Sequence, residues 1–138
     1  IKQRVSKVMP EDFKVEIISP AKIIFKGSAN LVTIPSFEGE MGVLKNHIPI
    51  VTFLRPGFVE IIGSQKKEKF FLEEGIVEFS NDTLLILSST VKNSKEFSKD
   101  EIQEQIDKAT KDLNLEDCTD KEKYILSYKI EGLKNISQ

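Results

Sequence analysis

The apolar residues of this chain change their spacing near residue 92. Before that point, short runs alternate apolar and polar residues with a period of two, as in 13–17, 58–61 and 76–79. This period is typical of half-buried β-strands. Turn signals rich in Pro, Gly, Asn and Ser separate the runs. The first part of the chain therefore predicts an antiparallel β-sandwich or flattened barrel, because no long helix is available for parallel crossovers.

Beyond residue 92 the apolar residues recur every three or four positions, as on one face of a helix. Ser98 and Glu101 have the spacing of a capping box, and Thr119 and Glu122 repeat it. The apolar positions that follow these two boxes are Ile102, Ile106, Ala109 and Leu113, then Leu126, Ile130 and Leu133. Two helices of about fifteen residues with a break at 114–118 predict an antiparallel hairpin.

Gly132 lies inside the second predicted helix, where glycine costs about 1 kcal/mol relative to alanine. We expect either a frayed helix end or a neighbour that requires close approach. An isolated two-helix hairpin is marginal in water, so the pair is expected to lean on the sandwich or on another protein. The predicted division is an N-terminal extension at 1–12, a β-sandwich domain at 13–91, a linker at 92–100 and an α-helical hairpin at 101–138.

Composition excludes several functions. The net charge of −2 provides no basic field for nucleic acid. No run approaches the roughly 18 apolar residues that direct membrane insertion as a helix requires. Cys118 is the one cysteine, so an intrachain disulfide is impossible and a reducing compartment is favoured. The chain starts at Ile1, which indicates a removed presequence or a trimmed chain, and the basic start at 2–7 suits a targeting region or a solvated terminus.

The 38–57 segment gathers three glycines, two prolines and the one histidine between two apolar strands. This punctuation predicts a shaped surface loop rather than a core element. For Glu38 and Glu40 a solvated acidic loop is favoured, a loop that contacts a partner is the alternative, and a catalytic pair is disfavoured. His47 is interpreted first as a loop histidine bonded to backbone, with an interface contact as the alternative.

Catalytic and metal-binding groups are scarce in the chain. His47 is far in sequence from Cys118, so neither a Cys–His pair nor a zinc site is predicted. No glycine-rich loop leads into Lys and Ser or Thr, and the acids around Gly39 and Gly42 would repel phosphate. These residues therefore favour an interaction protein over an enzyme.

Five blocks of sequence, in order, carry a resemblance to a known family. They are 15–20 followed by 24–27, 38–44 with His47 and Pro49, 54–61, 70–78 and 84–90. Together they resemble the small central-stalk subunit of rotary ATP synthases, which is called epsilon in bacteria and chloroplasts and delta in mitochondria. The resemblance implies a mainly β plus α fold, with an N-terminal ten-stranded antiparallel β-sandwich followed by a C-terminal antiparallel two-helix hairpin.

The resemblance implies a non-catalytic rotor subunit of the proton-translocating ATP synthase. In that family the subunit holds the gamma shaft on the membrane c-ring and turns with both, while ATP is made elsewhere. The implied partners are gamma and the c-ring, and neither a cofactor nor a metal is expected. Two other functions stay open: a bacterial-type epsilon that also inhibits ATP hydrolysis through its C-terminal helices, and a free-standing β-sandwich binding module.

The same matching implies which residues touch the partners. The acidic segment would meet the polar loops of the c-ring, where Arg and Gln side chains are common. Its residues are Glu38, Gly39, Glu40, Met41 and Gly42. The residues at positions that face gamma or the ring are Ser19, His47 and Thr52.

The first C-terminal helix departs from the family pattern. Many bacterial epsilon subunits carry an Asp-Glu-x-Arg-Ala-like run there, which binds ATP and tunes an inhibitory switch. Here 99–104 lacks the arginine, and Glu104 adds negative charge where a phosphate would sit, so neither ATP binding nor the switch is expected. With the absent initiator Met and the basic start, this favours the mitochondrial form. That form lies at the matrix face of the inner membrane with a small extra epsilon subunit; the cytoplasmic face of a bacterial inner membrane is the alternative.

Overall fold

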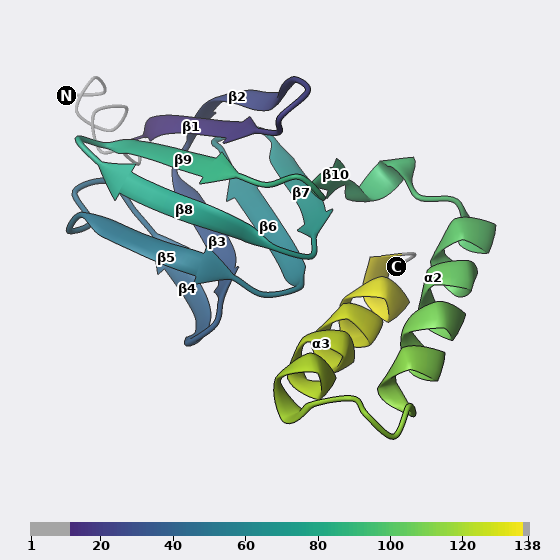
Figure 1. Ribbon diagram of the computed structural model, residues 1–138. Helices are drawn as coiled ribbons and strands as arrows, with labels where there is room; N and C mark the ends of the chain where they lie inside the picture. The colour runs from purple at the N-terminus through teal and green to yellow at the C-terminus, as the bar shows by residue number, and fades with distance from the viewer. Residues whose placement is uncertain (1–11, 137–138) are drawn as a thin grey trace, which may run out of the picture.

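The computed structural model describes residues 12–136, so the basic start and nearly all of the predicted extension at 1–12 lie outside the described residues. Within this range, ten strands come first and helices follow (Figure 1). The strands are β1 (Phe13–Ile18), β2 (Ile23–Ala29), β3 (Leu31–Ser36), β4 (Gly39–Val43), β5 (Ile50–Leu54), β6 (Gly57–Ile62), β7 (Lys67–Leu72), β8 (Gly75–Ser80), β9 (Thr83–Leu87) and β10 (Lys92–Asn93). The helices are the 3₁₀ turn η1 (Ser94–Glu96), α2 (Lys99–Leu113) and α3 (Asp120–Ile136).

The strands form one folded sheet in the order β10-β7-β6-β3-β5-β8-β9-β1-β2, and β4 pairs with β3. Figure 1 shows the sheet folded into two layers. The predicted sandwich and helical hairpin are confirmed. Among the strands of the described range, one pairing is not antiparallel: β1 lies parallel to β9, from Lys14 beside Thr83 to Ile18 beside Leu87. No crossover helix is needed for this pair, because the intervening strands themselves carry the chain around the fold.

Alternating side chains of these strands fill the space between the two layers. This is the core that the period-two pattern predicted, and burial of each such side chain contributes about 1.5–3 kcal/mol. Ring edges add to it, since Phe13 meets Phe79 at 5.6 Å between centroids. The members that are completely buried include Val15, Ile17, Val32, Ile34, Val59, Val77, Leu84 and Ile86.

Both predicted capping boxes are present. The Ser98 hydroxyl accepts a hydrogen bond from the Glu101 amide at 3.1 Å, and the Glu101 carboxylate accepts one from the Ser98 amide at 3.5 Å. Thr119 and Glu122 exchange the same two bonds at 3.1 and 2.8 Å. Each box satisfies amides that the first turn of a helix leaves unpaired. The segment predicted as a linker, 92–100, contains β10, η1 and the start of α2.

The helical hairpin packs on the sandwich through a second, small core. Phe71, Ile102 and Leu133 are its buried members, and Phe58 and Phe97 pack beside them. The Phe71 ring has edge contacts with both of those rings, at 5.4 and 5.9 Å between centroids. The hairpin therefore leans on the sandwich, which was one of the two supports expected for it.

Gly132 is buried at this contact. A Cβ at this position would collide with the Phe71 ring. The glycine therefore follows from close approach of α3 to β7, the second of the two reasons considered for it.

We predict that Gly132→Ala lowers stability, although the same change in a free helix stabilises it by about 1 kcal/mol. The added methyl group overpacks the Phe71 contact, which costs about 1–3 kcal/mol. Urea unfolding of the purified chain measures the difference. Ser127→Ala, on the exposed side of α3, is the matched control and is expected to be neutral or slightly stabilising. A Gly132→Ala protein as stable as that control would contradict the packing argument.

Candidate functional site: the acidic turn and the outer face of the sheet

The acidic segment is a β-hairpin, not the loop that its glycines predicted. Glu38 lies in the turn after β3, and Gly39 to Val43 form β4, with Gly39 opposite Ser36 and Val43 opposite Val32. Gly39 has a φ of 125°, which side chains rarely adopt, so a glycine is required where the turn enters β4. The loop prediction was therefore wrong for residues 39–43, because one glycine serves the turn and the other pairs within the strand. It was also wrong for residues 50–54, which form β5 and pair with β8.

Residues 37 and 38, the acidic turn between β3 and β4, are held in place by Ser36. This serine was not singled out by the sequence analysis. Its side chain is completely buried, and its hydroxyl accepts a hydrogen bond from the Glu38 amide at 3.0 Å. The Thr52 hydroxyl lies 3.5 Å from the same oxygen. Thr52 is therefore joined to the acidic turn through Ser36. A serine just before a turn is a known signal for this kind of bond, so the sequence held the clue.

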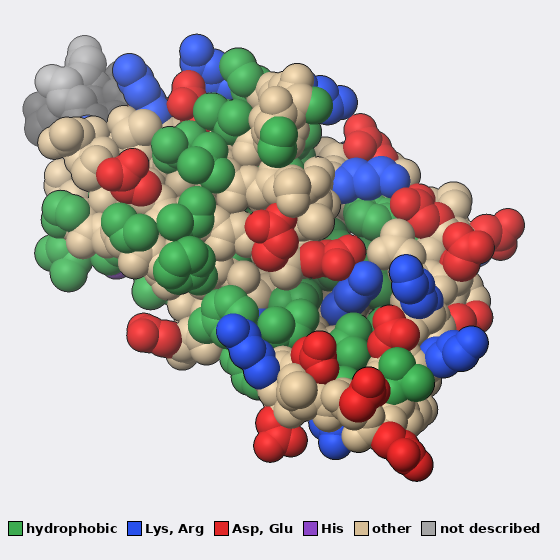
Figure 2. Space-filling model, viewed as in Figure 1, with side chains coloured by type: hydrophobic (Ala, Val, Ile, Leu, Met, Phe, Trp, Pro, Cys, Tyr) green, Lys and Arg blue, Asp and Glu red, His purple; other side chains and the backbone are tan. Residues whose placement is uncertain are grey.

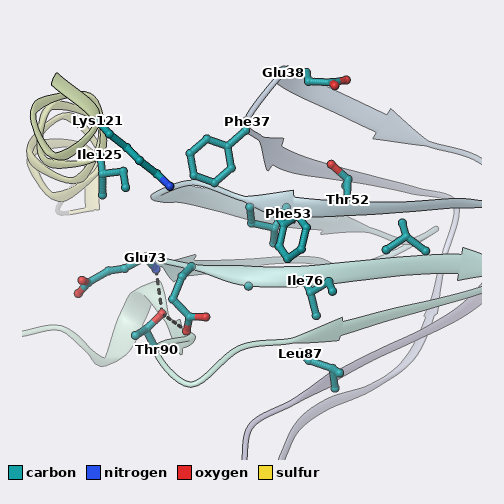
Figure 3. A pocket seen from close by; sticks show the side chains of 14 residues that line it. Phe37, Glu38, Thr52, Phe53, Glu73, Ile76, Leu87, Thr90, Lys121 and Ile125 are labelled. Atoms are coloured by element: carbon teal, nitrogen blue, oxygen red, sulfur yellow. Dashed lines mark hydrogen bonds between the residues drawn. The ribbon is translucent and has the colours of Figure 1, made fainter.

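Glu38 and Glu40 are both exposed, and neither forms an ion pair with another described residue. Figure 3 draws Glu38 at the end of its hairpin, with its carboxylate directed away from the other labelled side chains. Their separation along the hairpin and their exposure suit contact with another molecule better than acid–base chemistry, which needs converging and partly desolvated carboxylates.

His47 and Ser19 lie in other turns. The His47 ring bonds the Ile48 carbonyl through Nδ1 at 2.7 Å and meets the Phe79 ring edge-on at 6.0 Å between centroids. Its loop is tied to the β8–β9 turn, since the Asn46 amide donates to the Asp82 carboxylate at 2.9 Å. Ser19 bonds Lys22 within the β1–β2 turn. The structure thus joins Thr52 to the acidic turn but ties His47 and Ser19 to turns of their own.

The outer face of β5, β8 and β9 carries apolar side chains that the sequence reading did not single out. The strand register sets Phe53 beside Ile76 and Ile76 beside Leu87, one row across three strands. Phe53 is 63% exposed and Val51 66%. Figure 2 shows hydrophobic side chains gathered over this face. The four apolar residues of β5, interrupted only by Thr52, were the available signal, because a strand with apolar residues on both sides is usually covered on both sides.

A groove of about 1090 Å³ runs along this face beside α3. Its floor is the row of Phe53, Ile76 and Leu87, while Lys121 and Ile125 reach in from the helix (Figure 3). Exposed apolar surface of this kind, rimmed by polar groups, marks sites where proteins bind partners.

The Glu74 carboxylate lies at the edge of the groove and is held there by several hydrogen bonds. The Glu74 carboxylate accepts hydrogen bonds from the Ser89 amide at 2.9 Å, the Ser89 hydroxyl at 2.8 Å and the Thr90 hydroxyl at 3.3 Å. Burial acts to raise the pKa of Glu74, but the bonds from Ser89, Thr90 and Ser88 together hold the pKa below its ordinary value. These hydrogen bonds connect the β7–β8 turn to residues 88–90, which follow β9.

The described residues offer no group of three His, Cys, Asp or Glu side chains that could hold a metal ion. Cys118 lies in the α2–α3 loop, and partial desolvation and nearby carboxylates, Glu122 first, raise the pKa of its thiol. His47 is engaged with Phe79 and backbone instead. The structure therefore does not bring the two together as a nucleophile and base.

A family model described as the ATP synthase delta/epsilon chain, beta-sandwich domain, matches residues 12–94. The chain belongs to the ATP synthase delta/epsilon family. The ATP synthase epsilon chain of Pelagibacter ubique is 41% identical over 130 residues, which cover 94% of this chain and all of that relative. The epsilon chain 2 of Nitrobacter hamburgensis is 35% identical over 101 residues, covering 73% of this chain and 74% of the relative.

Two solved structures share the fold of this chain. One is a chain in the Euglena gracilis mitochondrial ATP synthase, OSCP/F1/c-ring, with a TM-score of 0.78 at 20% identity, covering 94% of this chain and 83% of that one. The other is in the Tetrahymena thermophila mitochondrial ATP synthase central stalk/c-ring, with a TM-score of 0.60 at 16% identity, covering 91% and 96%.

Membership of the delta/epsilon family confirms the predicted class. The chain is a non-catalytic, epsilon-type subunit of an ATP synthase. The predicted preference for the mitochondrial form is not confirmed, and its small extra partner is not supported, because the relatives are bacterial epsilon chains. Among residues 12–136, no helix combines the length and the apolar character needed to cross a bilayer.

We predict that Glu74→Gln destabilises the chain at neutral pH and that the loss shrinks in acid. The folded pKa of Glu74 is depressed, so its charge contributes stability that is present above the unfolded pKa of about 4.5 and is lost as the pH falls through the folded value. Urea unfolding at pH 7 and pH 3 measures this. Glu78→Gln, an exposed carboxylate on β8, is the control. A Glu74→Gln effect independent of pH would contradict the role of the charge.

Proposed function

We propose that the chain is a rotor subunit that couples the gamma shaft to the membrane c-ring during proton-driven ATP synthesis. The observation that carries the proposal is the apolar row of Phe53, Ile76 and Leu87 on a well-packed sandwich, close to an acidic turn. Phe53 and Leu87 are exposed and Ile76 is half-buried. An apolar face of this size is unfavourable in water unless a partner covers it. An acidic turn is stable in water and suits a polar or cationic partner.

The apolar face supports gamma as its partner. A joint that transmits torque must not slip, and protein interfaces resist slipping where apolar side chains interlock at the packing density of a core. The face lies on three paired strands, so its side chains are held by a stiff frame rather than by a mobile loop. The free-standing binding module is disfavoured, since the chain is a subunit of a known complex.

The acidic turn supports the c-ring as its partner. Glu38 and Glu40 are exposed and unpaired among the described residues, so they can pair with the polar and cationic side chains expected in the ring loops. Gly39, Met41 and Gly42 belong to the same hairpin and would share this contact. Thr52 would support the turn through Ser36 while its neighbours on β5 face gamma.

The His47 loop and Ser19 are proposed as further contacts with gamma or the ring. Ile48 is 72% exposed and Leu44 is 57% exposed, so the loop around His47 presents apolar surface of its own. Its shape is held by the Asn46–Asp82 bond. Ser19 is half-buried in the β1–β2 turn and offers a hydroxyl at the surface.

We favour the bacterial form, at the cytoplasmic face of the inner membrane, over the mitochondrial one, because the Pelagibacter relative aligns along its whole length at 41% identity. The bacterial form raises the question of inhibition through the C-terminal helices. The Glu101 carboxylate bonds Lys92 at 3.0 Å, and that bond is the main cause of its lowered pKa. An acid fixed here supports the absence of ATP binding, which calorimetric titration with ATP tests.

We predict that Phe53→Ser weakens binding to gamma at least tenfold. Phe53 is 63% exposed in the free chain, so its loss should remove contact with the partner and leave folding intact. Calorimetric titration of the variant against a gamma-containing subcomplex measures the affinity. Leu115→Ser, an exposed apolar residue of the α2–α3 loop, is the matched control. Equal affinities for Phe53→Ser and wild type would argue against the apolar face as the gamma contact.

We predict that the double variant Glu38→Lys, Glu40→Lys loosens the contact with the ring, because it sets cations against cations. Proton-driven ATP synthesis by the complex in vesicles should fall severalfold, while ATP hydrolysis by the detached catalytic part stays unchanged. The control is Glu116→Lys, Asp117→Lys, which reverses two exposed charges in the α2–α3 loop. Normal assembly and normal proton-driven synthesis in the Glu38/Glu40 variant would refute the ring contact.

A further inference from the structure

The first turns of α3 touch the acidic turn directly. The Tyr124 hydroxyl donates a hydrogen bond to the Phe37 carbonyl at 3.2 Å. The two rings stack at 6.0 Å between centroids, with 16° between their planes. Phe37 immediately precedes Glu38, so α3 is hydrogen-bonded to the backbone of the turn that carries the Glu38 carboxylate.

The turn is therefore held from two sides. On the sheet side, the Phe37 amide donates to the Phe53 carbonyl at 3.3 Å and the Glu38 amide to the Ser36 hydroxyl at 3.0 Å. On the helix side, only Tyr124 reaches the turn backbone among the described hydrogen bonds. Backbone groups of an exposed two-residue turn would otherwise exchange freely with water, and a bond from a rigid helix restricts them.

The rest of α3 has contacts that do not involve the Tyr124 hydroxyl, although the Tyr128 ring meets the Tyr124 ring edge-on at 4.9 Å between centroids. Arg55 lies over the Tyr128 ring, with its guanidinium carbon 3.8 Å from the ring centroid. Lys129 pairs with Glu73 at 3.1 Å. Leu133 is completely buried in the Phe71 cluster. Three contacts beyond Tyr124 therefore hold the helix, so losing the Tyr124 hydroxyl should not release it.

We infer that Tyr124 is a positioning residue, through which the docked helical hairpin sets the conformation of the acidic turn. The inference rests on the proposed ring contact for its functional meaning, but the positioning itself is a property of the free chain. The helices would thus serve the ring contact without touching the ring. Their docking would fix where the Glu38 carboxylate points, and undocking would leave the turn held from the sheet side alone.

Amide hydrogen exchange of the full chain tests the positioning. Tyr124→Phe keeps the stacked ring and removes the hydroxyl. Since one hydrogen bond changes such an equilibrium by a modest factor, exchange at the Glu38 and Gly39 amides should quicken roughly two- to tenfold. Tyr124→Ala should quicken it further. The Leu133 amide should exchange at the wild-type rate in Tyr124→Phe, which separates a local effect from a general loss of stability.

Ser127→Ala, on the exposed side of the same helix, is the matched control and should leave every one of these amides unchanged. Unchanged exchange at Glu38 and Gly39 in both Tyr124 variants would overturn the inference. So would a Tyr124→Phe protein in which Leu133 quickens as much as the turn.

A second measurement addresses the ring. In the assembled complex, the Glu40→Cys variant should crosslink to the loop of the c-ring, and adding Tyr124→Phe should lower the yield. If no crosslink forms even with Tyr124 intact, the ring contact fails and the functional half of the inference fails with it. The exchange result stands or falls separately, so the two failures can be told apart.

Discussion

Two adjacent phenylalanines of β7, Phe70 and Phe71, pack into the two hydrophobic cores of the molecule. Because neighbouring side chains of a strand point to opposite faces, Phe70 enters the core between the sheet layers while Phe71 enters the cluster that receives the helices. One strand therefore supplies both cores. A shift of β7 by a single residue would move each ring to the opposite face of the sheet and disrupt both cores at once. The burial of Gly132 and Leu133 and the docked position of α3 all depend on this strand keeping its register.

Local patterns in the sequence predicted most of the elements, because they depend on neighbours along the chain. Alternation located β1, β6 and β8, and both capping boxes lie where their spacing placed them. β4 was missed because glycines, read as loop signals, are tolerated where a strand leaves a tight turn. The long-range contacts were beyond reach of pattern alone. Gly132 looked costly from sequence, and only the ring of Phe71, some sixty positions away, explains it.

The candidate site was predicted unevenly for the same reason. The exposed acids could be located, since composition and turn signals mark them. Ser36 could have been connected to them, because a serine just before a turn commonly accepts such a bond. Tyr124 could not, because it acts from a helix near the chain end. The apolar row needs three strands in register before it exists. Strand pairing brings the residues of such a surface together, so no single segment of the sequence contains all of them.

The parallel pairing of β1 with β9 sets an order of events in the making of the protein. β1 pairs with β2, which follows it directly, and with β9, which lies some seventy residues further along the chain. Contacts so distant in sequence form slowly. Leu87, the last member of the apolar row, belongs to β9. A chain still emerging from the ribosome therefore lacks both the closed sandwich and the finished row. Under the proposed gamma contact, incorporation into the complex would require a molecule whose synthesis has passed β9.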